Sequence, residues 1–420
     1  MKKVDLLIVN AKELVTLQGP NRARKGREMK ELGVIPQGTI AVQDGKIVAI
    51  GKTAEITEEY KSKHIVEATG KVVMPGFVDP HTHPIFVHTR ENEYAMRIEG
   101  KTYVEIAQAG GGIRSTIKTT RDASKTVLFD LALNRIRKMM NMGTTTLEAK
   151  SGYGLSTESE IRQLEVIHML QKVLPLDIVP TFMGAHEYPA EYKENHEEYL
   201  RILENEMLPA VKDTGLAEYC DIFTEAHVYS IDESRRILTR AKELGFKLRM
   251  HADELEPIGG AELAAELGCI TADHLGAASD KGIKALAEKN VIAVLLSGTI
   301  FSLGLKSYAR ARDMITAGVP VALATDYNPG SCNCDSMQTI ISIACSQMRM
   351  TPEEAITAST INSAYALELG DRVGSFEVGK QADLLIMDIP SYKYIPYHLG
   401  SSGIETVIKK GEIIYNNMNS

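Results

Sequence analysis

The central part of the chain alternates regularly between segments typical of strands and segments typical of helices. Apolar runs with strand character occur eight times, at residues 72–79, 143–149, 177–183, 219–224, 247–252, 270–273, 291–296 and 319–325. Segments with the apolar spacing of helices lie between them, at 124–141, 157–173, 232–244, 258–267, 279–289 and 336–347. Eight repeats of strand and helix predict an α/β chain folded as a (β/α)8, TIM-like barrel. In that fold the active site lies at the carboxyl ends of the strands.

The two ends of the chain have a different, β-rich texture. Strand-like runs and hairpins occur at 4–9, 39–51, 64–69, 374–388 and 406–415. The dipeptide Asp44-Gly45 is the turn signal of one hairpin, whereas the polar segment 20–38 is predicted to be an exposed loop. We therefore predict a small composite β-sandwich domain from residues 1–70 and 366–420, with a metal-dependent catalytic barrel at 71–365 inserted between them.

Charge and composition exclude several classes of partner. The 420 residues carry a formal net charge of −8 and no long basic run, which argues against nucleic acid and anionic membranes. No apolar stretch approaches the roughly 20 residues of a membrane span, and Asp5, Asn10 and Lys12 interrupt any secretory leader. The five cysteines are odd in number and scattered, which favours a reduced, cytoplasmic protein.

Histidines and a carboxylate stand at the ends of several predicted strands. His81 and His83 end the first strand, and residues two apart in a strand point to the same side. His251 ends the fifth strand and Asp326 the eighth. Three imidazoles and one carboxylate suit Zn²⁺ or iron with a position left for water. The sequence therefore predicts one metal ion held by His81, His83, His251 and Asp326.

Two further residues at strand ends are predicted to take part in catalysis with Asp326. A bound metal ion would lower the pKa of its water towards ~7 and supply hydroxide. Glu254, three residues after His251, is placed to move protons to and from that water, and His274 to polarise the substrate from the opposite side. Taken singly, each residue has an ordinary structural explanation, such as a buried histidine, a turn aspartate or a solvated acid. Their joint occurrence at strand ends favours a reactive site.

The segment from Pro75 to His83 (Pro-Gly-Phe-Val-Asp-Pro-His-Thr-His), followed by His251, His274 and Asp326, resembles the amidohydrolase superfamily. The resemblance covers essentially the whole chain. It implies metal-dependent hydrolysis in a barrel framed by a β-sandwich of both chain ends. No lysine ends the fourth predicted strand, which argues against a carboxylated lysine bridging two metals; Lys150 belongs to the second strand.

Four finer motifs are similar to one branch of that superfamily: Lys150–Gly154, Gly184–Glu187, His251–Glu254 and Ala324–Ser331. Members of the branch hydrolyse 4-imidazolone-5-propanoate, a cyclic amide of histidine degradation, to N-formimidoyl-L-glutamate. The resemblance implies a set of substrate-binding residues: Arg90, Tyr153, His186, Glu254, Asn328, Gly330 and Ser331. A planar arginine fork suits the propionate carboxylate of this substrate, so Arg90 is expected to hold it. Without the resemblance, Arg90 is equally explained as a surface arginine.

Other functions remain open at this point. A deaminase of the same superfamily would use the same metal and release ammonia instead of opening the ring. A non-catalytic metal-binding barrel is a third alternative, although every expected catalytic residue is present. We expect zinc rather than iron, a homodimer because related barrels commonly dimerise, and a flexible lid at Gly110–Gly112.

Overall fold

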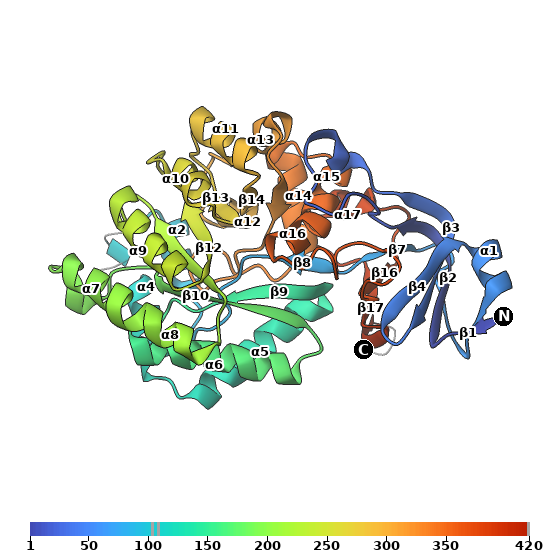
Figure 1. Cartoon of the computed structure of the whole chain (residues 1–420), viewed down its shortest axis with the longest axis horizontal. Helices are drawn as coiled ribbons and strands as arrows, with labels where there is room; N and C mark the ends of the chain where they lie inside the picture. Colours follow the sequence, from blue (N-terminus) through green and yellow to red (C-terminus); the bar gives the residue numbers. More distant parts are fainter. Residues whose placement is uncertain (102–104, 107–109, 418–420) are drawn as a thin grey trace.

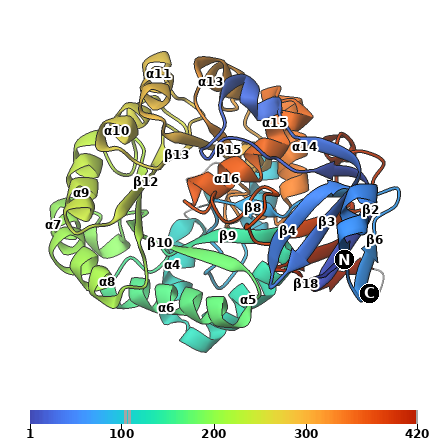
Figure 2. The same cartoon turned by 45° about the vertical axis from the view of Figure 1, so that its right-hand side comes forward.

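The computed structural model describes residues 1–101, 105–106 and 110–417. Eight parallel strands follow one another in chain order around a barrel, which confirms the predicted fold class (Figures 1 and 2). The barrel strands are β8 (Phe77–Asp79), β9 (Thr144–Lys150), β10 (Asp177–Ala185), β11 (Tyr219–Thr224), β12 (Lys247–Ala252), β13 (Thr271–His274), β14 (Ile292–Leu295) and β15 (Val321–Leu323). Each lies within a few residues of a predicted strand.

Helices surround the barrel and cover its outer face (Figure 2). Serine side chains begin several of them: Ser124, Ser156 and Ser230 each accept a hydrogen bond from a backbone N–H of the first turn. The α-helices in the described residues are α1 (Thr53–Glu59), α2 (Glu91–Ile98), α4 (Ile113–Asp122), α5 (Lys125–Asn141), α6 (Thr157–Val173), α7 (His196–Ile202), α8 (Leu208–Thr214), α9 (Ile231–Glu243), α10 (Gly260–Leu267), α11 (Asp280–Lys289), α12 (Ser297–Ser302), α13 (Ala311–Ala317), α14 (Met337–Met348), α15 (Pro352–Ala358), α16 (Ile361–Ala366) and α17 (Tyr394–Tyr397). None of them is long and apolar enough to cross a membrane.

The barrel closes between its first and last strands, β8 and β15. Asp79 accepts hydrogen bonds from the backbone N–H and the hydroxyl of Thr325, at 3.0 and 2.6 Å. Just beyond the strands, the N–H of Asp326 donates to the carbonyl of His81 at 3.1 Å, and the N–H of His83 donates to the carbonyl of Tyr327 at 2.8 Å. The two segments that carry predicted metal ligands are therefore joined along this seam.

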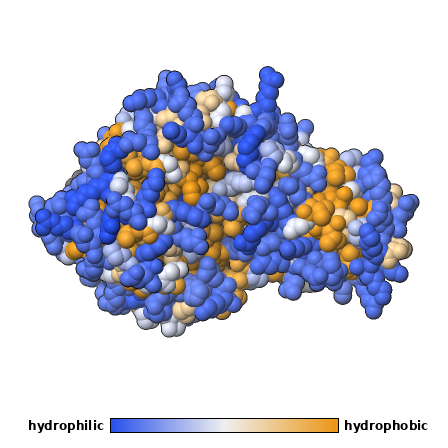
Figure 3. Space-filling model, in the orientation of Figure 1, coloured by the Kyte–Doolittle hydropathy of each residue, from blue (hydrophilic) through white to orange (hydrophobic). Residues whose placement is uncertain are grey.

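A second, mixed sheet is built from both ends of the chain, as predicted (Figure 1). Its strand order is β18-β17-β16-β7-β2-β3-β4, with β6 beside β2. These strands are β2 (Leu6–Val15), β3 (Val34–Gln43), β4 (Lys46–Lys52), β6 (His64–Glu67), β7 (Val72–Pro75), β16 (Leu384–Met387), β17 (Ile404–Lys409) and β18 (Glu412–Asn416); β1 (Lys2–Lys3) and β5 (Tyr60–Lys61) form a separate pair. Buried Ile8, Ile40, Phe376 and Leu384 share one apolar core within it. Apolar surface is visible on this sheet, at the right of the view, and further apolar patches are visible over the barrel (Figure 3).

The sequence prediction is wrong about the first barrel strand. The single strand predicted at 72–79 is two strands: β7 pairs with β16 in the mixed sheet, and only β8 lies in the barrel. Gly76 separates them, where a Cβ atom would collide with Thr145. The domain boundary at residue 71 stays a prediction. Strand β7, which follows it in the chain, belongs to the mixed sheet built from the chain ends.

The segment 20–38 is only in part the exposed loop that its charges suggest, since a few of its residues are buried and β3 begins at Val34. Arg24 is 1% exposed and donates a hydrogen bond to the carbonyl of Glu31 at 2.6 Å. Met29 is buried in a short 3-10 helix at Gly26–Lys30. A guanidinium can be buried when backbone carbonyls accept its hydrogen bonds, and the sequence alone does not reveal those carbonyls.

Candidate metal centre and active site

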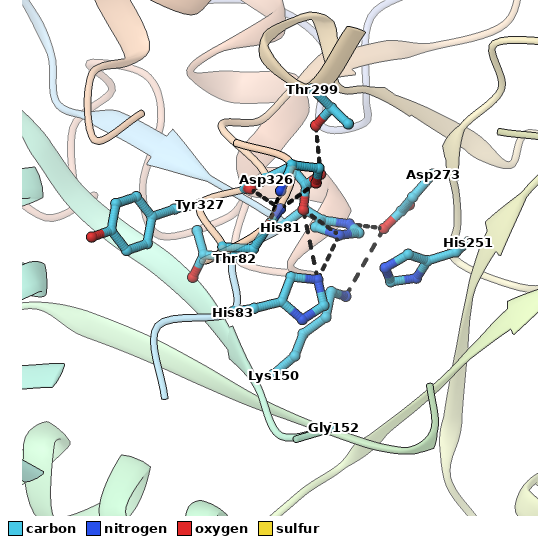
Figure 4. A network of polar contacts seen from close by, with 12 residues as sticks. His81, Thr82, His83, Lys150, Gly152, His251, Asp273, Thr299, Asp326 and Tyr327 are labelled. Carbon is cyan, nitrogen blue, oxygen red and sulfur yellow. Dashed lines mark hydrogen bonds and ion pairs between the residues drawn. The ribbon is translucent and has the colours of Figure 1, made fainter. Parts of the chain in front are cut away.

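Three imidazoles and one carboxylate meet at the carboxyl-terminal mouth of the barrel (Figure 4). The Nε2 atoms of His81 and His83 are 3.2 Å apart. Asp326 Oδ1 lies 3.6 Å from His81 Nε2 and 3.7 Å from His83 Nε2. The ring of His251 is centred 4.4 Å from that of His81. The structure therefore brings together the four residues predicted as ligands.

The spacing of these donor atoms fits a single metal ion. Tetrahedral ligands about 2.1 Å from a zinc ion are about 3.4 Å from one another, close to the three separations above. Among the described residues, two groups have donor atoms within 4.8 Å of one another, and both include His81: His81, His83 and Asp326, and His81, His251 and His274. Nitrogen and carboxylate donors of this kind suit a divalent transition metal.

Two of the histidines are oriented by carboxylates. His81 Nδ1 is 2.6 Å from Asp273 Oδ2, and His251 Nδ1 is 3.1 Å from Asp221 Oδ1. A carboxylate at Nδ1 fixes the tautomer that leaves the Nε2 lone pair for the metal. His83 Nδ1 has no hydrogen-bond partner among the described residues.

Burial lowers the pKa of His81, His83 and His274 well below the ordinary histidine range, which favours their neutral form. At His251 the charge and hydrogen bond of Asp221 outweigh burial and raise the pKa. A neutral imidazole keeps the lone pair that a metal ligand needs. Burial raises the pKa of Asp326 to about 6, and a hydrogen bond from the hydroxyl of Thr299 to Asp326 Oδ2, at 2.5 Å, favours the ionised carboxylate.

Several site residues have left-handed backbone conformations. The φ angles are 48° at Asp253, 72° at His274 and 52° at Asp326. Such conformations cost about 1–3 kcal/mol at a non-glycine residue and cluster at functional sites. All three residues lie at or just after the ends of barrel strands.

Glu254 lies beside His274, and not opposite it as predicted, because the turns after β12 and β13 bring the two side chains together. Its Oε1 is 3.6 Å from His274 Nδ1, and its side chain is 11% exposed. Burial, followed by the charge of Asp326, raises the pKa of Glu254 to about 8. A carboxyl group with a pKa near neutrality is suited to taking up and giving back a proton. The loop that carries it is fixed by Glu225, which accepts hydrogen bonds from the N–H groups of Leu255 and Glu256.

Tyr153 and His186 form a wall next to the ligands. The ring of His186 stacks on that of His83, with centroids 5.1 Å apart, and Tyr153 lies 5.2 Å from His186. His186 Nδ1 lies 2.9 Å from the carbonyl oxygen of Gly152, and burial lowers the pKa of His186 to about 3. A neutral ring held at Nδ1 leaves Nε2 available to a substrate.

Arg90 lies further out, beside the segment that carries Gly330. Its Nε and Nη2 donate to Glu93 Oε2 at 2.9 and 2.6 Å. Its Nη1 lies so close to Gly330 that a Cβ atom there would collide with it. Arg90 lines cavities of about 220 and 330 Å³ on its two sides. Glu93 therefore occupies one edge of the guanidinium and leaves Nη1 without a hydrogen bond to the described residues.

Asn328 and Ser331 belong to one tight turn after β15. Asn328 Oδ1 accepts hydrogen bonds from the N–H groups of Gly330 and Ser331, and its Nδ2 donates to the hydroxyl of Ser331 at 2.8 Å. The side chain of Asn328 thus stabilises the turn by hydrogen bonds to its own neighbours. Gly112, in the predicted lid, donates its N–H to Glu93 Oε1 at 2.9 Å; lid motion stays a prediction, and the neighbouring residues 107–109 lie outside the described part of the chain.

Sequence reasoning missed a second layer beneath the ligands. Lys150 Nζ lies 2.6 Å from Asp221 Oδ2 and 4.0 Å from Asp273 Oδ2. The sequence did contain an indication of this layer. Lys150 and Asp221 are charged residues within the apolar strands β9 and β11, and a buried charge needs a partner. The ion pairs also indicate that Lys150 is an ammonium, and carboxylation would require the neutral amine.

Comparison with known proteins agrees with this geometry. The model of the Amidohydrolase family matches residues 72–414. An imidazolonepropionase from Alkaliphilus oremlandii is 50% identical over 414 residues, which cover 98% of each chain. The chain belongs to the imidazolonepropionase branch of the amidohydrolase family. An imidazolonepropionase from Symbiobacterium thermophilum is also 50% identical, over 99% of this chain and 98% of its own.

Solved structures with much lower sequence identity share the fold. An adenosine deaminase from Xanthomonas campestris with bound zinc has a TM-score of 0.72 at 20% identity, covering 98% of this chain and 93% of its own. A mutant of the atrazine chlorohydrolase TrzN from Arthrobacter aurescens, complexed with zinc and atraton, has a TM-score of 0.75 at 14% identity, covering 98% and 95%. As an imidazolonepropionase-family chain with this donor set, the protein is a hydrolase with a divalent metal site.

Proposed function

We infer that this site hydrolyses the ring C–N bond of 4-imidazolone-5-propanoate to give N-formimidoyl-L-glutamate, the reaction of the imidazolonepropionase family. The observation that carries the inference is the convergence of His81, His83 and Asp326 within 3.2–3.7 Å, in a chain 50% identical to curated members of that family.

We propose that His81, His83, His251 and Asp326 hold one ion per subunit and that the ion is zinc rather than iron. Neutral imidazoles with one carboxylate suit both metals, and the deaminase that shares the fold is described with zinc. When bound, such an ion lowers the pKa of its water to about 7 and polarises a carbonyl group. Elemental analysis of the protein purified without added metal tests the assignment.

Glu254 is proposed to move the protons of the reaction. Its carboxylate takes the proton from the attacking water and later delivers it to the ring nitrogen as the C–N bond breaks. The raised pKa of about 8 makes both directions accessible near neutral pH. His274, held neutral by burial, is proposed to donate a hydrogen bond to the carbonyl oxygen as negative charge develops there.

Arg90 is proposed to bind the propionate carboxylate, with Tyr153 and His186 against the ring and the Asn328–Ser331 turn near the glutamate part of the product. A hydrogen bond to a charged group contributes about 1.5–3 kcal/mol, so Arg90→Gln is expected to raise KM by roughly 10- to 100-fold. Metal content and the unfolding midpoint are expected to stay as in the wild type. Steady-state kinetics measure the effect, with Arg310→Gln as the control, since Arg310 is an exposed arginine at the start of α13 that pairs with Asp280. An unchanged KM would mean that another cation binds the carboxylate.

The reaction itself is tested by following the absorbance decay of imidazolone propionate with and without a chelator. We expect decay that stops when the metal is removed and returns when it is added back. Release of ammonia from a purine or pyrimidine, without decay of the imidazolone, would instead identify a deaminase.

We also propose a homodimer in the reduced cytoplasm. All five cysteines are free thiols, and Cys220, Cys269 and Cys332 are buried. Light scattering of the purified protein tests the dimer, for which a mass near twice 46.1 kDa is expected.

A further inference from the structure

A cluster of five charged side chains is buried beneath the metal ligands, inside the barrel. The cluster consists of Lys150, Arg249, Glu148, Asp221 and Asp273, and none of their side chains is exposed. The cluster contains two cations and three carboxylates. Charges this deeply buried are costly unless each is paired, so their arrangement calls for a reason beyond filling the barrel.

Lys150 is central to the cluster because its ammonium reaches carboxylates from three strands. It lies 2.7 Å from Glu148 Oε2 in β9, 2.6 Å from Asp221 Oδ2 in β11 and 4.0 Å from Asp273 Oδ2 in β13. Figure 4 shows the side chain passing below His83 towards Asp273. Arg249 lies 3.3 Å from Glu148 Oε1 on the opposite side of that carboxylate.

The two aspartates are the same groups that orient metal-ligating histidines. Asp221 uses Oδ2 for Lys150 and Oδ1 for His251 Nδ1. Asp273 uses Oδ2 for His81 Nδ1, at 2.6 Å, on the side that faces Lys150. A single ammonium is thus linked, through one carboxylate each, to two of the four proposed ligands.

We propose that Lys150 is a positioning residue for the metal site, which holds Asp221 and Asp273 so that His81 and His251 both present Nε2 to the ion. The proposal rests on the ligand set proposed above. Without the ammonium, the two carboxylates would lie close together in a buried site with no shared cation. They would then repel each other and turn away, and a displaced carboxylate no longer orients the imidazole that it contacts.

The test compares Lys150→Met with a matched variant, Lys409→Met. Lys409 is also a buried lysine between two aspartates, Asp177 and Asp383, each at 2.7 Å, but it lies in β17 of the mixed sheet. Both variants are expected to lower the unfolding midpoint of the metal-free protein. Only Lys150→Met is expected to raise the dissociation constant for Zn²⁺, measured by chelator competition, and by about 10- to 100-fold. The visible spectrum of the Co²⁺-loaded protein, which reports ligand geometry, should change in Lys150→Met alone.

A second variant keeps the proposal testable if Lys150→Met does not fold. In Lys150→Met/Glu148→Gln, one buried negative charge is removed together with the ammonium, while Asp221, Asp273 and all ligands remain. The proposal requires that Zn²⁺ binding stays weakened in this variant. A dissociation constant equal to that of the wild type, or an equal loss in Lys409→Met, would overturn it.

An error in the proposed set of metal ligands would give a different result from an error in the role of Lys150. If wild-type protein binds no Zn²⁺, or if His83→Ala binds it as tightly as the wild type, the proposed metal site is wrong. If those two measurements behave as expected and Lys150→Met still binds Zn²⁺ normally, only the role of Lys150 is wrong.

Discussion

Replacing Glu254 with glutamine is expected to lower kcat by about 10²- to 10⁴-fold, the usual contribution of a positioned general base or acid. Glutamine keeps the size and hydrogen bonding of the side chain but can neither take up nor release the proton. The four proposed ligands are untouched, so the metal content should equal that of the wild type. Steady-state turnover of imidazolone propionate and elemental analysis of the same preparation measure the two quantities.

Glu256→Gln is the matched control for this variant. Glu256 is an exposed glutamate in the same loop, and its backbone N–H donates to Glu225 just as that of Leu255 does. Its side chain should not affect turnover. Loss of metal from Glu254→Gln would show that Glu254 supports or ligates the ion and does not act chiefly as a proton carrier.

His83→Ala is expected to abolish metal binding at micromolar Zn²⁺ and to remove turnover with it. His83 is the cleanest ligand to delete, because its Nδ1 has no partner among the described residues, whereas removal of His81 would leave Asp273 without its imidazole. With His83 removed, the site keeps only three of the four protein ligands proposed for it. Chelator competition and turnover assays measure the effect.

His64→Ala serves as the control for general effects of losing an imidazole. His64 lies exposed in β6, in the mixed sheet and away from the barrel mouth. The His64→Ala protein should bind one ion per chain and turn over imidazolone propionate at the wild-type rate. Full metal occupancy in His83→Ala would remove His83 from the ligand set.

Most strands and turns could be predicted because the apolar runs and the turn residues of the sequence indicate the same elements. The hairpin at Asp44-Gly45 appears with both residues at positive φ, 51° and 71°, as the dipeptide predicts. Strand 72–79 was predicted as one unit because its apolar run is continuous. Its division depends on the close approach of Thr145 to Gly76, a contact between remote segments that a local pattern does not contain.

The same distinction applies to the site. The convergence of His81, His83, His251 and Asp326 follows from the sequence because each stands at a strand end, and a barrel brings all strand ends to one mouth. The pairing of Lys150 with Asp221 and Asp273 was not predictable, because it depends on which interior side chains of non-adjacent strands reach one another. Nor did spacing suggest that Asn328 is engaged within its own turn or that Arg90 is held by Glu93.

The seam between β8 and β15 joins the start and the end of the barrel, since Asp79 and Thr325 are 246 positions apart in the chain. His81 and Asp326, two of the proposed ligands, lie on its two sides, so an ion bound by both would connect the first and last barrel strands. Metal that binds only the closed barrel stabilises it by mass action, and the unfolding midpoint should rise with the concentration of free Zn²⁺. By the same linkage, a substitution that loosens the seam, such as Thr325→Val, should weaken metal binding although it removes no ligand.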